Sequence, residues 1–400
     1  MRIGYIDHQY PERRNIIGCI QDKNVQYVYI RMSLRNKLRR LHYLIKRVFK
    51  IRDSNLYYFY NSNRTDVDII HTFNDVVDVP GKWCVTFETV FPRTNFILNM
   101  GWREDKQLVH TNVNTGNSVR LDSVSSRYLN LCEKENCRAM IALSKNAAQI
   151  EKCVLHSLGY SDDSVLCKKI TVLSPPQKVL INAENFDKKF SHLEKGLQFV
   201  FVGREFFRKG GKELVEVLSE FEGKENFHLT VISSLKYVDV ATHSSRKDKE
   251  QMEKIMQEKD WITWKKEIPN AEVLDICREA HVGFLPTIKD SYGYGVLEMQ
   301  ACGCPVVTTD VRALPEINDL NCGWVIPVKK FSISKEAVYN THEDLMERQE
   351  EIRRGLRACL NDIFANREKI REKGKNCLKR IEKEHNPEEY ADALYSIYKN

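Results

Sequence analysis

The chain has 400 residues, more than a single hydrophobic core accommodates, so we expect about two domains. Hydrophobic residues make up 42% of it and charged residues 29%, which is typical of a soluble globular protein and excludes a disordered or fibrous chain. The net charge of +7 is modest, but it is unevenly distributed along the chain.

Targeting signals and metal-binding patterns are not found in the sequence. The first residues form no signal peptide, and no run approaches the roughly 18 apolar residues of a spanning helix. We therefore expect a cytoplasmic location. The twelve cysteines are scattered, as expected of small buried hydrophobes in a reducing compartment. The closest pairs, Cys132/Cys137 and Cys302/Cys304, lack zinc-like partners, so we expect no metal site.

Short β-branched runs alternate with longer amphipathic runs along the chain. This pattern predicts an α/β fold with parallel sheets covered by helices on both faces. The predicted strands are 2–7, 25–30, 67–73, 83–88, 139–143, 169–174, 197–203, 227–233, 282–287 and 305–310. Helical patterns lie between them, among others at 211–220, 271–280 and 296–301.

A basic segment at 31–52 holds nine Lys or Arg residues and no acidic residue. Its apolar residues recur at steps of three and four, which predicts an amphipathic helix: Leu34, Leu38, Leu41, Ile45, Val48 and Phe49. Three interpretations stay open. The apolar stripe belongs to the core, or the helix lies on an anionic membrane, or it binds nucleic acid. The third is disfavoured because groove-reading or aromatic-interleaved motifs are absent, so we expect no nucleic acid partner.

Prolines, Asn and charged residues mark a linker at 175–196. It separates a first Rossmann-like domain at 1–174 from a second Rossmann-like domain at 197–375. Two such units are expected to leave a cleft at the carboxyl ends of their strands. The last segment, 376–400, has Tyr390, Leu394 and Ile397 on one helical face, so we expect that helix to dock on the first domain.

The loop after the strand at 197–203 has the composition of an anion site. Gly203 ends the strand, Arg204 and Lys209 follow, and a helix is predicted to start near 210–211. A helix N-terminus offers free amides, Arg forks onto phosphate oxygens, and Lys adds a point charge. The alternative is a loop with solvated basic residues.

Two carboxylates bracket a second glycine-rich turn, in 290–298. Gly293 and Gly295 let backbone amides approach a ligand closely. Glu298 is expected in the first helical turn, where it suits a vicinal diol such as a ribose. The alternative for Glu298 is a simple complement to the helix dipole. With Asp290 as a second acid, the two loops together predict a nucleotide-sugar site.

These motifs resemble the retaining GT-B glycosyltransferases of family 4, also described as glycosyl transferases group 1. The G-R…K-G loop stands at Gly203-Arg204 and Lys209-Gly210, and E-x7-E stands as Asp290-x7-Glu298. The A-x-G-x-P-V-V-x-x-D motif follows at 301–310 and L-P-E-I at 314–317. Asp290 departs from the pattern, since it is one methylene shorter than the usual Glu.

The resemblance implies two Rossmann-like doubly wound domains facing a central cleft, with the first domain on the acceptor side and the second binding the nucleotide-sugar donor. It implies that Arg204 and Lys209 bind the donor diphosphate, that Glu298 holds the nucleotide ribose and that Asp290 contacts donor-sugar hydroxyls. It further implies that the donor is held by the amides around Gly293, Tyr294, Gly295 and Val296. No metal or cofactor is implied, because Arg, Lys and helix dipoles stabilise the departing diphosphate. We expect a UDP-sugar donor in preference to a GDP-sugar.

The first domain departs from the family at its first loop. The segment 8–15 replaces the usual Gly-Gly loop, and Arg13 and Arg14 stand where backbone amides would close over the diphosphate. Glu88, at a predicted strand end, is the candidate for a catalytic or acceptor-contacting group, with an ion pair to Arg93 as the alternative.

The expected activity is transfer of a hexose or N-acetylhexosamine to a glycan or a lipid-linked glycan, with retention of configuration, in cell-surface polysaccharide synthesis. Such an enzyme would be peripheral on the inner face of the membrane, attached through 31–52. Two alternatives are a non-catalytic GT-B-like binding protein at the membrane and a sugar-nucleotide epimerase.

Overall fold

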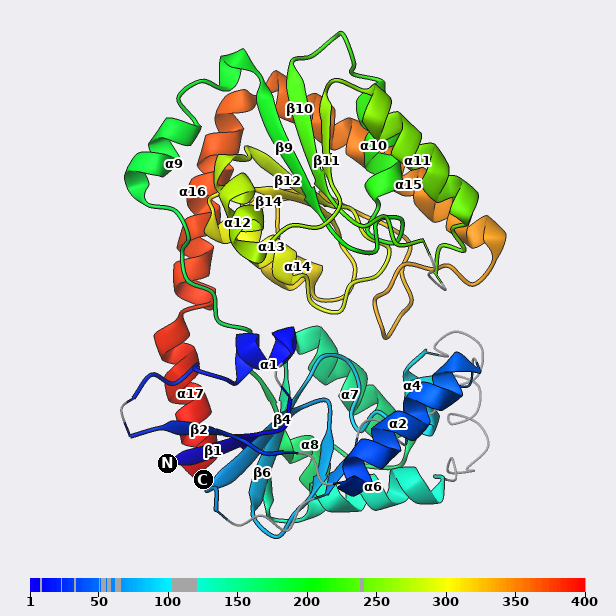
Figure 1. Cartoon of the computed structure of the whole chain (residues 1–400), viewed down its shortest axis with the longest axis vertical. Helices are drawn as coiled ribbons and strands as arrows, with labels where there is room; N and C mark the ends of the chain where they lie inside the picture. The colour runs from blue at the N-terminus through cyan, green and yellow to red at the C-terminus, as the bar shows by residue number, and fades with distance from the viewer. Residues whose placement is uncertain are drawn as a thin grey trace. The chain divides into compact units, whose positions relative to one another are not determined.

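The computed structural model describes residues 1–7, 9–22, 24–31, 34–49, 51, 55, 59–61, 66–102, 121–237 and 241–399, with the backbone alone at 47, 61, 101 and 102. The chain divides into two compact units (Figure 1). Unit 1 comprises Met1–Pro176, Ser332–Ser334 and Asn386–Asn400, and unit 2 comprises Gln177–Phe331 and Lys335–His385.

Unit 1 is built on a six-stranded parallel sheet in the order β2-β1-β4-β6-β7-β8. Its strands are β1 (Arg2–Tyr5), β2 (Gln26–Tyr29), β4 (Ile69–Phe73), β6 (Lys82–Phe87), β7 (Cys137–Ala142) and β8 (Ile170–Val172). Two further strands, β3 (Phe59–Asn61) and β5 (Val76–Asp78), pair with each other. The central strands are almost wholly buried, as expected when both faces of a parallel sheet are covered.

The helices of unit 1 are α1 (Tyr10–Asn15), α2 (Leu34–Val48), α4 (Asn95–Trp102), α6 (Ser123–Glu133), α7 (Lys145–Ser157), α8 (Val165–Lys169) and α17 (Pro387–Lys399). N-cap side chains stabilise the first turns of several of these helices. Asp122 accepts hydrogen bonds from amides in the first turn of α6, and Ser144 accepts one from an amide in the first turn of α7. Most of the segment expected to be a loop at 8–15 is the helix α1, with Pro11 in its first turn, where the missing N–H is tolerated. Residue 8 lies outside the described residues.

Helix α17 packs on the sheet of unit 1 through Tyr390, Leu394 and Tyr398, all buried. Tyr398, rather than the expected Ile397, completes the buried face, and Ile397 is only partly covered. The Tyr398 hydroxyl lies 2.6 Å from Nδ1 of His71 in β4, and Tyr390 donates a hydrogen bond to the carbonyl of Asn15 at 2.7 Å.

Helix α2 holds the basic segment, whose residues 32, 33, 50 and 52 lie outside the described residues. Its apolar stripe is exposed: Leu34 has 74% and Val48 has 80% of its surface accessible. The interpretation that this stripe belongs to the core of the first domain is therefore wrong. The helix packs on unit 1 with its polar side instead, through Asn36 and Arg40.

Unit 2 contains a second six-stranded parallel sheet, in the order β11-β10-β9-β12-β13-β14. Its strands are β9 (Leu197–Val202), β10 (Phe227–Ile232), β11 (Ile262–Lys265), β12 (Val282–Leu285), β13 (Val306–Thr309) and β14 (Gly323–Ile326). Counted within the unit, this is the order 3-2-1-4-5-6 of a dinucleotide-binding Rossmann sheet. The order reverses between β9 and β12, so their carboxyl ends form the switch point where such sheets bind ligands.

The helices of unit 2 are α9 (Ala183–Lys189), the 3-10 turn η1 (Leu193–Lys195), α10 (Gly211–Ser219), α11 (Arg246–Glu258), α12 (Asn270–Glu279), α13 (Tyr294–Ala301), α14 (Leu314–Ile317), α15 (His342–Ala365) and α16 (Arg367–Glu384). The segment predicted as a linker, 175–196, contains α9 and η1, and from Gln177 on it belongs to unit 2.

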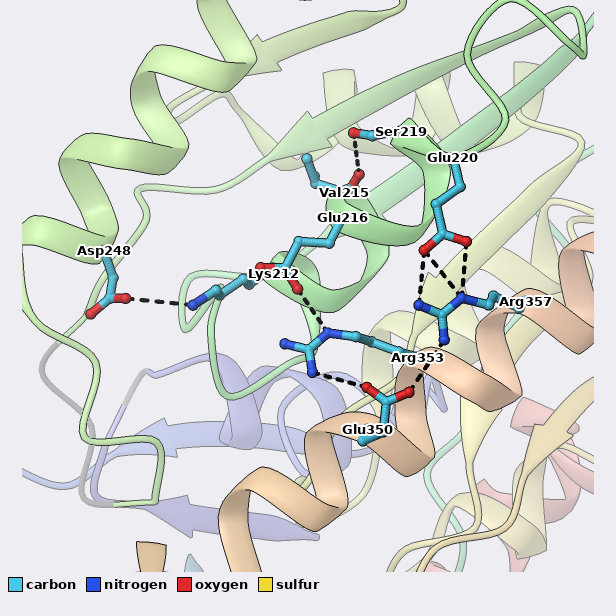
Figure 2. A network of polar contacts seen from close by, with 9 residues as sticks. All are labelled: Lys212, Val215, Glu216, Ser219, Glu220, Asp248, Glu350, Arg353 and Arg357. Carbon is cyan, nitrogen blue, oxygen red and sulfur yellow. Dashed lines mark hydrogen bonds and ion pairs between the residues drawn. The ribbon is translucent and has the colours of Figure 1, made fainter. Parts of the chain in front are cut away.

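Ion pairs join α10 to its neighbours α15 and α11 (Figure 2). Arg353 lies 2.8 Å from Glu216, Arg357 lies 2.8 Å from Glu220, and Lys212 reaches Asp248 at 3.5 Å. Glu350 contacts both arginines. A network of this kind holds the helix that begins at the switch point in one orientation.

All ten predicted strands are present, with ends within two residues of the prediction. The sequence analysis missed β3, β5, β11 and β14, which are three or four residues long. The cysteines are free thiols, and most are buried, as expected of small hydrophobes. Among the described residues, no helix has both the length and the apolar character needed to cross a membrane.

Candidate functional site

Two loops meet at the switch point of unit 2. Residues 203–210 follow β9 and residues 286–293 follow β12, and these two strands are hydrogen-bonded neighbours. The two motifs that the sequence analysis singled out therefore lie at one edge of one sheet.

The Lys209 ammonium lies 3.4 Å from Oδ2 of Asp290, and both side chains are about four-fifths buried. Gly203 makes this approach feasible. A Cβ at position 203 would lie 2.5 Å from Cδ of Lys209, so any larger residue would displace the lysine side chain from the end of β9. The structure thus brings together Gly203, Lys209 and Asp290 from the two predicted motifs.

Asp290 is held by its own loop as well. Its Oδ1 accepts a hydrogen bond from the Tyr292 amide at 3.3 Å, the pattern of an Asx turn. One carboxylate oxygen therefore supports the turn that leads to Gly293, and the other faces Lys209.

Further hydrogen bonds that the sequence analysis missed tie the two loops together. The buried Thr287 hydroxyl contacts the carbonyls of Arg208 and Lys289, and the Ile288 amide donates to the Arg208 carbonyl at 3.1 Å. The Arg208 guanidinium donates to the Lys289 carbonyl. The available signal was a threonine two residues after a buried strand, because a buried hydroxyl must find a hydrogen-bond partner.

Glycines begin the two helices that start at this edge. Gly210 and Gly293 are the N-cap residues of α10 and α13, both with positive φ (78° and 99°) and neither with a side-chain cap. Ser245 and Thr341, in contrast, cap α11 and α15 with their hydroxyls. The first amides of α10 and α13 are therefore not occupied by an N-cap side chain, and two positive dipole ends meet at the switch point.

The start of α13 corrects one expectation. The helix begins at Tyr294, and its first turn contains no acidic residue, so Glu298 lies in the second turn rather than the first. The reason is the positive φ of Gly293, which ends the preceding loop earlier than expected. Since the dipole effect falls off within the first turn, the interpretation of Glu298 as a dipole complement loses its basis. A Cβ at Gly295 would meet no heavy atom within 4 Å, so this turn opens to free space, while Val296 is buried.

Arg204 is exposed at the start of the first loop. Next to it, Glu205 lies 3.4 Å from Arg208 and 3.3 Å from Lys236. Burial alone would raise the pKa of Glu205, but Arg208, Lys209 and Lys236 together lower it, so this loop is strongly cationic around one carboxylate.

A buried polar cluster anchors the second loop, 286–293, through its residue Lys289. Lys289 Nζ lies 3.0 Å from Oε2 of Glu336, which also accepts a hydrogen bond from Tyr339 at 2.8 Å and pairs with Arg312. Burial lowers the pKa of Lys289 to about 8 although Glu336 opposes this shift. Burial would raise the pKa of Glu336, but Arg312 and Lys289 lower it. The sequence offered no signal for this cluster, because its members come from three distant segments.

In unit 1, Glu88 follows β6 and accepts a hydrogen bond from Arg93 at 2.6 Å. The ion pair that the sequence analysis kept as an alternative is thus present. Arg13 is exposed, and Arg14 donates to the carbonyl of Pro176 at 3.4 Å.

The switch point of unit 1 lies between β1 and β4 and carries carboxylates. Asp7 follows β1 and Asp75 follows β4, and Arg40 of α2 reaches both, at 3.1 and 3.4 Å. Burial raises the pKa of Asp75 to about 7, with Glu12 and Asp7 adding to the shift and Arg40 opposing it. Sequence analysis did not find this group, since its members are separated by a helix and several strands.

Comparison with known proteins finds similarity to glycosyltransferases at the level of family, sequence and structure. Residues 182–358 match the family described as glycosyl transferases group 1. A stretch of 92 residues is 30% identical to the D-inositol 3-phosphate glycosyltransferase of Paenarthrobacter aurescens (strain TC1) and covers 23% of this chain and 22% of that relative.

Several solved structures resemble the whole chain, and two of them illustrate the likeness. Sucrose-phosphate synthase from Thermosynechococcus elongatus has a TM-score of 0.61 and 14% identity, covering 100% of this chain and 98% of its own. HepE of Anabaena, solved with UDP and glucose, has a TM-score of 0.57 and 9% identity, covering 99% and 98%. At these identities the likeness establishes the fold, which is the GT-B class with two Rossmann-like units.

Proposed function

Because residues 182–358 belong to the glycosyl transferases group 1, we propose that this protein is a glycosyltransferase of family 4 that retains the configuration of the transferred sugar. It moves a hexose or an N-acetylhexosamine from a nucleoside-diphosphate sugar to a hydroxyl of a glycan or lipid-linked glycan, in cell-surface polysaccharide synthesis. The donor is a UDP-sugar in preference to a GDP-sugar, in keeping with HepE, which was solved with UDP and glucose.

The observation that carries this proposal is the arrangement around Lys209. A lysine and two helix N-termini without side-chain caps converge at the switch point of unit 2. Each of them favours an anion, and together they suit a diphosphate. The nearby Glu298 carboxylate accepts hydrogen bonds from the ribose hydroxyls, and Asp290 contacts hydroxyls of the donor sugar.

The chemical step breaks the bond between the sugar C1 and the diphosphate oxygen and forms a bond from C1 to the acceptor oxygen. The acceptor hydroxyl gives up its proton in the same step, and the departing diphosphate oxygen accepts it. Negative charge accumulates on the departing diphosphate as the first bond lengthens. Lys209, Arg204 and the amides at 293–296 stabilise that charge, which is the largest electrostatic demand of the reaction. These groups supply the positive charge that a metal ion supplies in other transferases, so the proposed mechanism is independent of metal.

Unit 1 forms the acceptor side, and Glu88 contacts the acceptor. Its pair with Arg93 holds the carboxylate at the carboxyl end of β6, where an acceptor hydroxyl can reach it. The protein works in the cytoplasm at the inner face of the membrane, where lipid-linked acceptors are present.

A thermal-shift screen of UDP- and GDP-sugars tests the donor site, because a ligand that binds only the native state raises the midpoint of unfolding. We expect stabilisation by UDP and by one UDP-sugar, and release of UDP when an acceptor is added. Failure of every nucleotide to bind would contradict the proposal and favour a non-catalytic binding protein. Conversion of the donor to an epimer without acceptor would identify an epimerase.

A further inference from the structure

Helix α2 presents a continuous apolar face to solvent. Six side chains of this face are about half exposed or more: Leu34 (74%), Leu38 (56%), Leu41 (52%), Leu44 (49%), Ile45 (49%) and Val48 (80%). Phe49, which directly follows the helix, is also exposed, with 72% of its surface accessible. Their spacing of three and four residues places them on one side of the helix. Isolated exposed apolar residues are ordinary, but a contiguous stripe marks a surface that binds something.

The opposite side of α2 fixes the helix to unit 1. Arg40 pairs with Asp7 and Asp75, Asn36 is buried, and the Arg39 guanidinium lies 4.5 Å from the centre of the Phe59 ring. Rotating the helix to bury its apolar face would break both ion pairs and expose Asn36. The outward direction of the stripe is therefore determined by specific polar contacts.

The charges beside the stripe select the partner. Arg35 and Lys37 are exposed on α2, and Arg31 is exposed just before it. The sequence 31–52 contains no acidic residue. A second copy of this chain packed on the stripe through a two-fold axis would bring these cations against each other. A surface that is apolar in its interior and anionic at its rim fits both properties, and a bilayer with anionic headgroups is such a surface.

We propose that α2 lies in the headgroup region of an anionic membrane, with the six apolar side chains of its outer face inserted among the acyl chains and its basic residues at the phosphates. The attachment is peripheral and pre-formed, because the helix is already held in place by Arg40. It differs from a segment that folds only on the membrane.

The position of α2 ties this surface to the acceptor side of the proposed function. Asp7 and Asp75, which hold Arg40, stand at the carboxyl ends of β1 and β4. A membrane bound by α2 therefore lies next to the ligand-binding edge of unit 1. If the proposed transferase activity holds, this placement favours an acceptor whose lipid anchor stays in the bilayer.

Sedimentation with vesicles tests the docking. The probes are vesicles of phosphatidylcholine alone and of phosphatidylcholine mixed with phosphatidylglycerol. We expect the protein to bind the mixed vesicles, to bind neutral vesicles at least about tenfold more weakly, and to be released by salt.

The variant Leu41→Glu/Ile45→Glu is expected to lose binding to mixed vesicles by at least about tenfold, because a charge in the inserted face is unfavourable. Leu320→Glu, a matched control at a 70% exposed leucine of unit 2, should bind as the wild type does. Arg35→Glu/Lys37→Glu should also weaken binding, whereas Lys254→Glu in α11 should not.

Equal vesicle binding by the double variant and the wild type would overturn the proposal. So would lipid-independent dimerisation that the Leu41→Glu/Ile45→Glu variant abolishes without any vesicle binding by the wild type. Thermal stabilisation by UDP, measured on the same samples, keeps the two proposals separate. Vesicle binding without UDP binding would support the membrane docking and contradict the proposed transferase. UDP binding without vesicle binding would support the donor site and contradict the docking.

Discussion

The Lys209 ammonium and the Asp290 carboxylate lie 3.4 Å apart at the switch point of unit 2, although they follow different strands. This pair closes the cationic loop after β9 onto the glycine-rich turn after β12. It also leaves the lysine within reach of an anion, since about a fifth of each side chain remains exposed.

The first prediction concerns Lys209. Lys209→Ala should lower kcat by at least about tenfold, because it removes a charge that stabilises the departing diphosphate in the proposed mechanism. Lys212→Ala is the control: Lys212 follows in the first turn of α10, but its side chain pairs with Asp248 of α11 and not with Asp290, so the kcat of this variant should stay near that of the wild type. A Lys209→Ala enzyme with normal turnover would show that this lysine does not serve the reaction.

The second prediction concerns the coupling between the two residues. Asp290→Asn keeps an oxygen for the Tyr292 amide but removes the charge that faces Lys209. In a double-mutant cycle with Lys209→Ala, measured on kcat/KM, we expect a coupling of about 0.5 kcal/mol or more. Strictly additive effects would mean that Asp290 acts on the substrate without help from the lysine.

The third prediction concerns Glu298. Glu298→Ala should weaken donor binding by about ten- to a hundredfold, because hydrogen bonds to a charged group contribute about 1.5–3 kcal/mol. A 2′-deoxy or 3′-deoxy donor should bind the wild type more weakly than the normal donor does, yet bind the variant almost as well as the normal donor does. Calorimetry measures both. If the variant still discriminates fully between the two donors, the ribose is held elsewhere.

The fourth prediction concerns stability and pH. His71 is fully buried, with Tyr398 at 2.6 Å and Thr86 at 2.8 Å, and burial lowers its pKa to about 3. In the unfolded chain its pKa is near 6.5. The folded state therefore binds fewer protons, and the contribution of His71 to stability is present above pH 6.5 and is lost as the pH falls towards 3.

The expected loss has a slope of at most about 1.4 kcal/mol per pH unit. Buried acids act in the opposite direction: burial raises the pKa of Glu12 and Asp75 to about 7 and that of Glu151 to about 8. The difference between the wild type and His71→Gln in denaturant unfolding, followed from pH 7 to pH 4, isolates the histidine. A constant difference over this range would show that His71 does not titrate as expected.

Local chemistry explains how much could be anticipated. The β-branched and apolar runs at 197–203 and 227–233 predicted strands correctly, because a strand buried on both faces of a parallel sheet consists almost wholly of such residues. The glycines at 203, 293 and 295 and the cations at 204 and 209 identified the loops, because their residue types are restricted by backbone approach and by anion binding. The short strands β11 and β14 escaped, since four residues at a sheet edge leave little periodic signal.

Contacts between residues far apart in the sequence could not be predicted from the sequence. The cluster of Lys289, Arg312 and Glu336 assembles from three segments, and each residue alone resembles an ordinary surface charge. The same holds for Arg40 with Asp7 and Asp75. The start of α13 at Tyr294, which moved Glu298 into the second turn, depends on the backbone angle of Gly293, and a residue type only permits such an angle.

By itself the sequence determined the α/β class, the positions of the ten predicted strands along the chain, the two loops of the candidate site and the amphipathic nature of 31–52, because each follows from the spacing and type of neighbouring residues. Only the tertiary structure decided that Lys209 meets Asp290 and that the apolar side of α2 faces outward. Both depend on which strands become neighbours and which polar groups pair across the fold, and such pairing is a property of the packed chain rather than of any local segment.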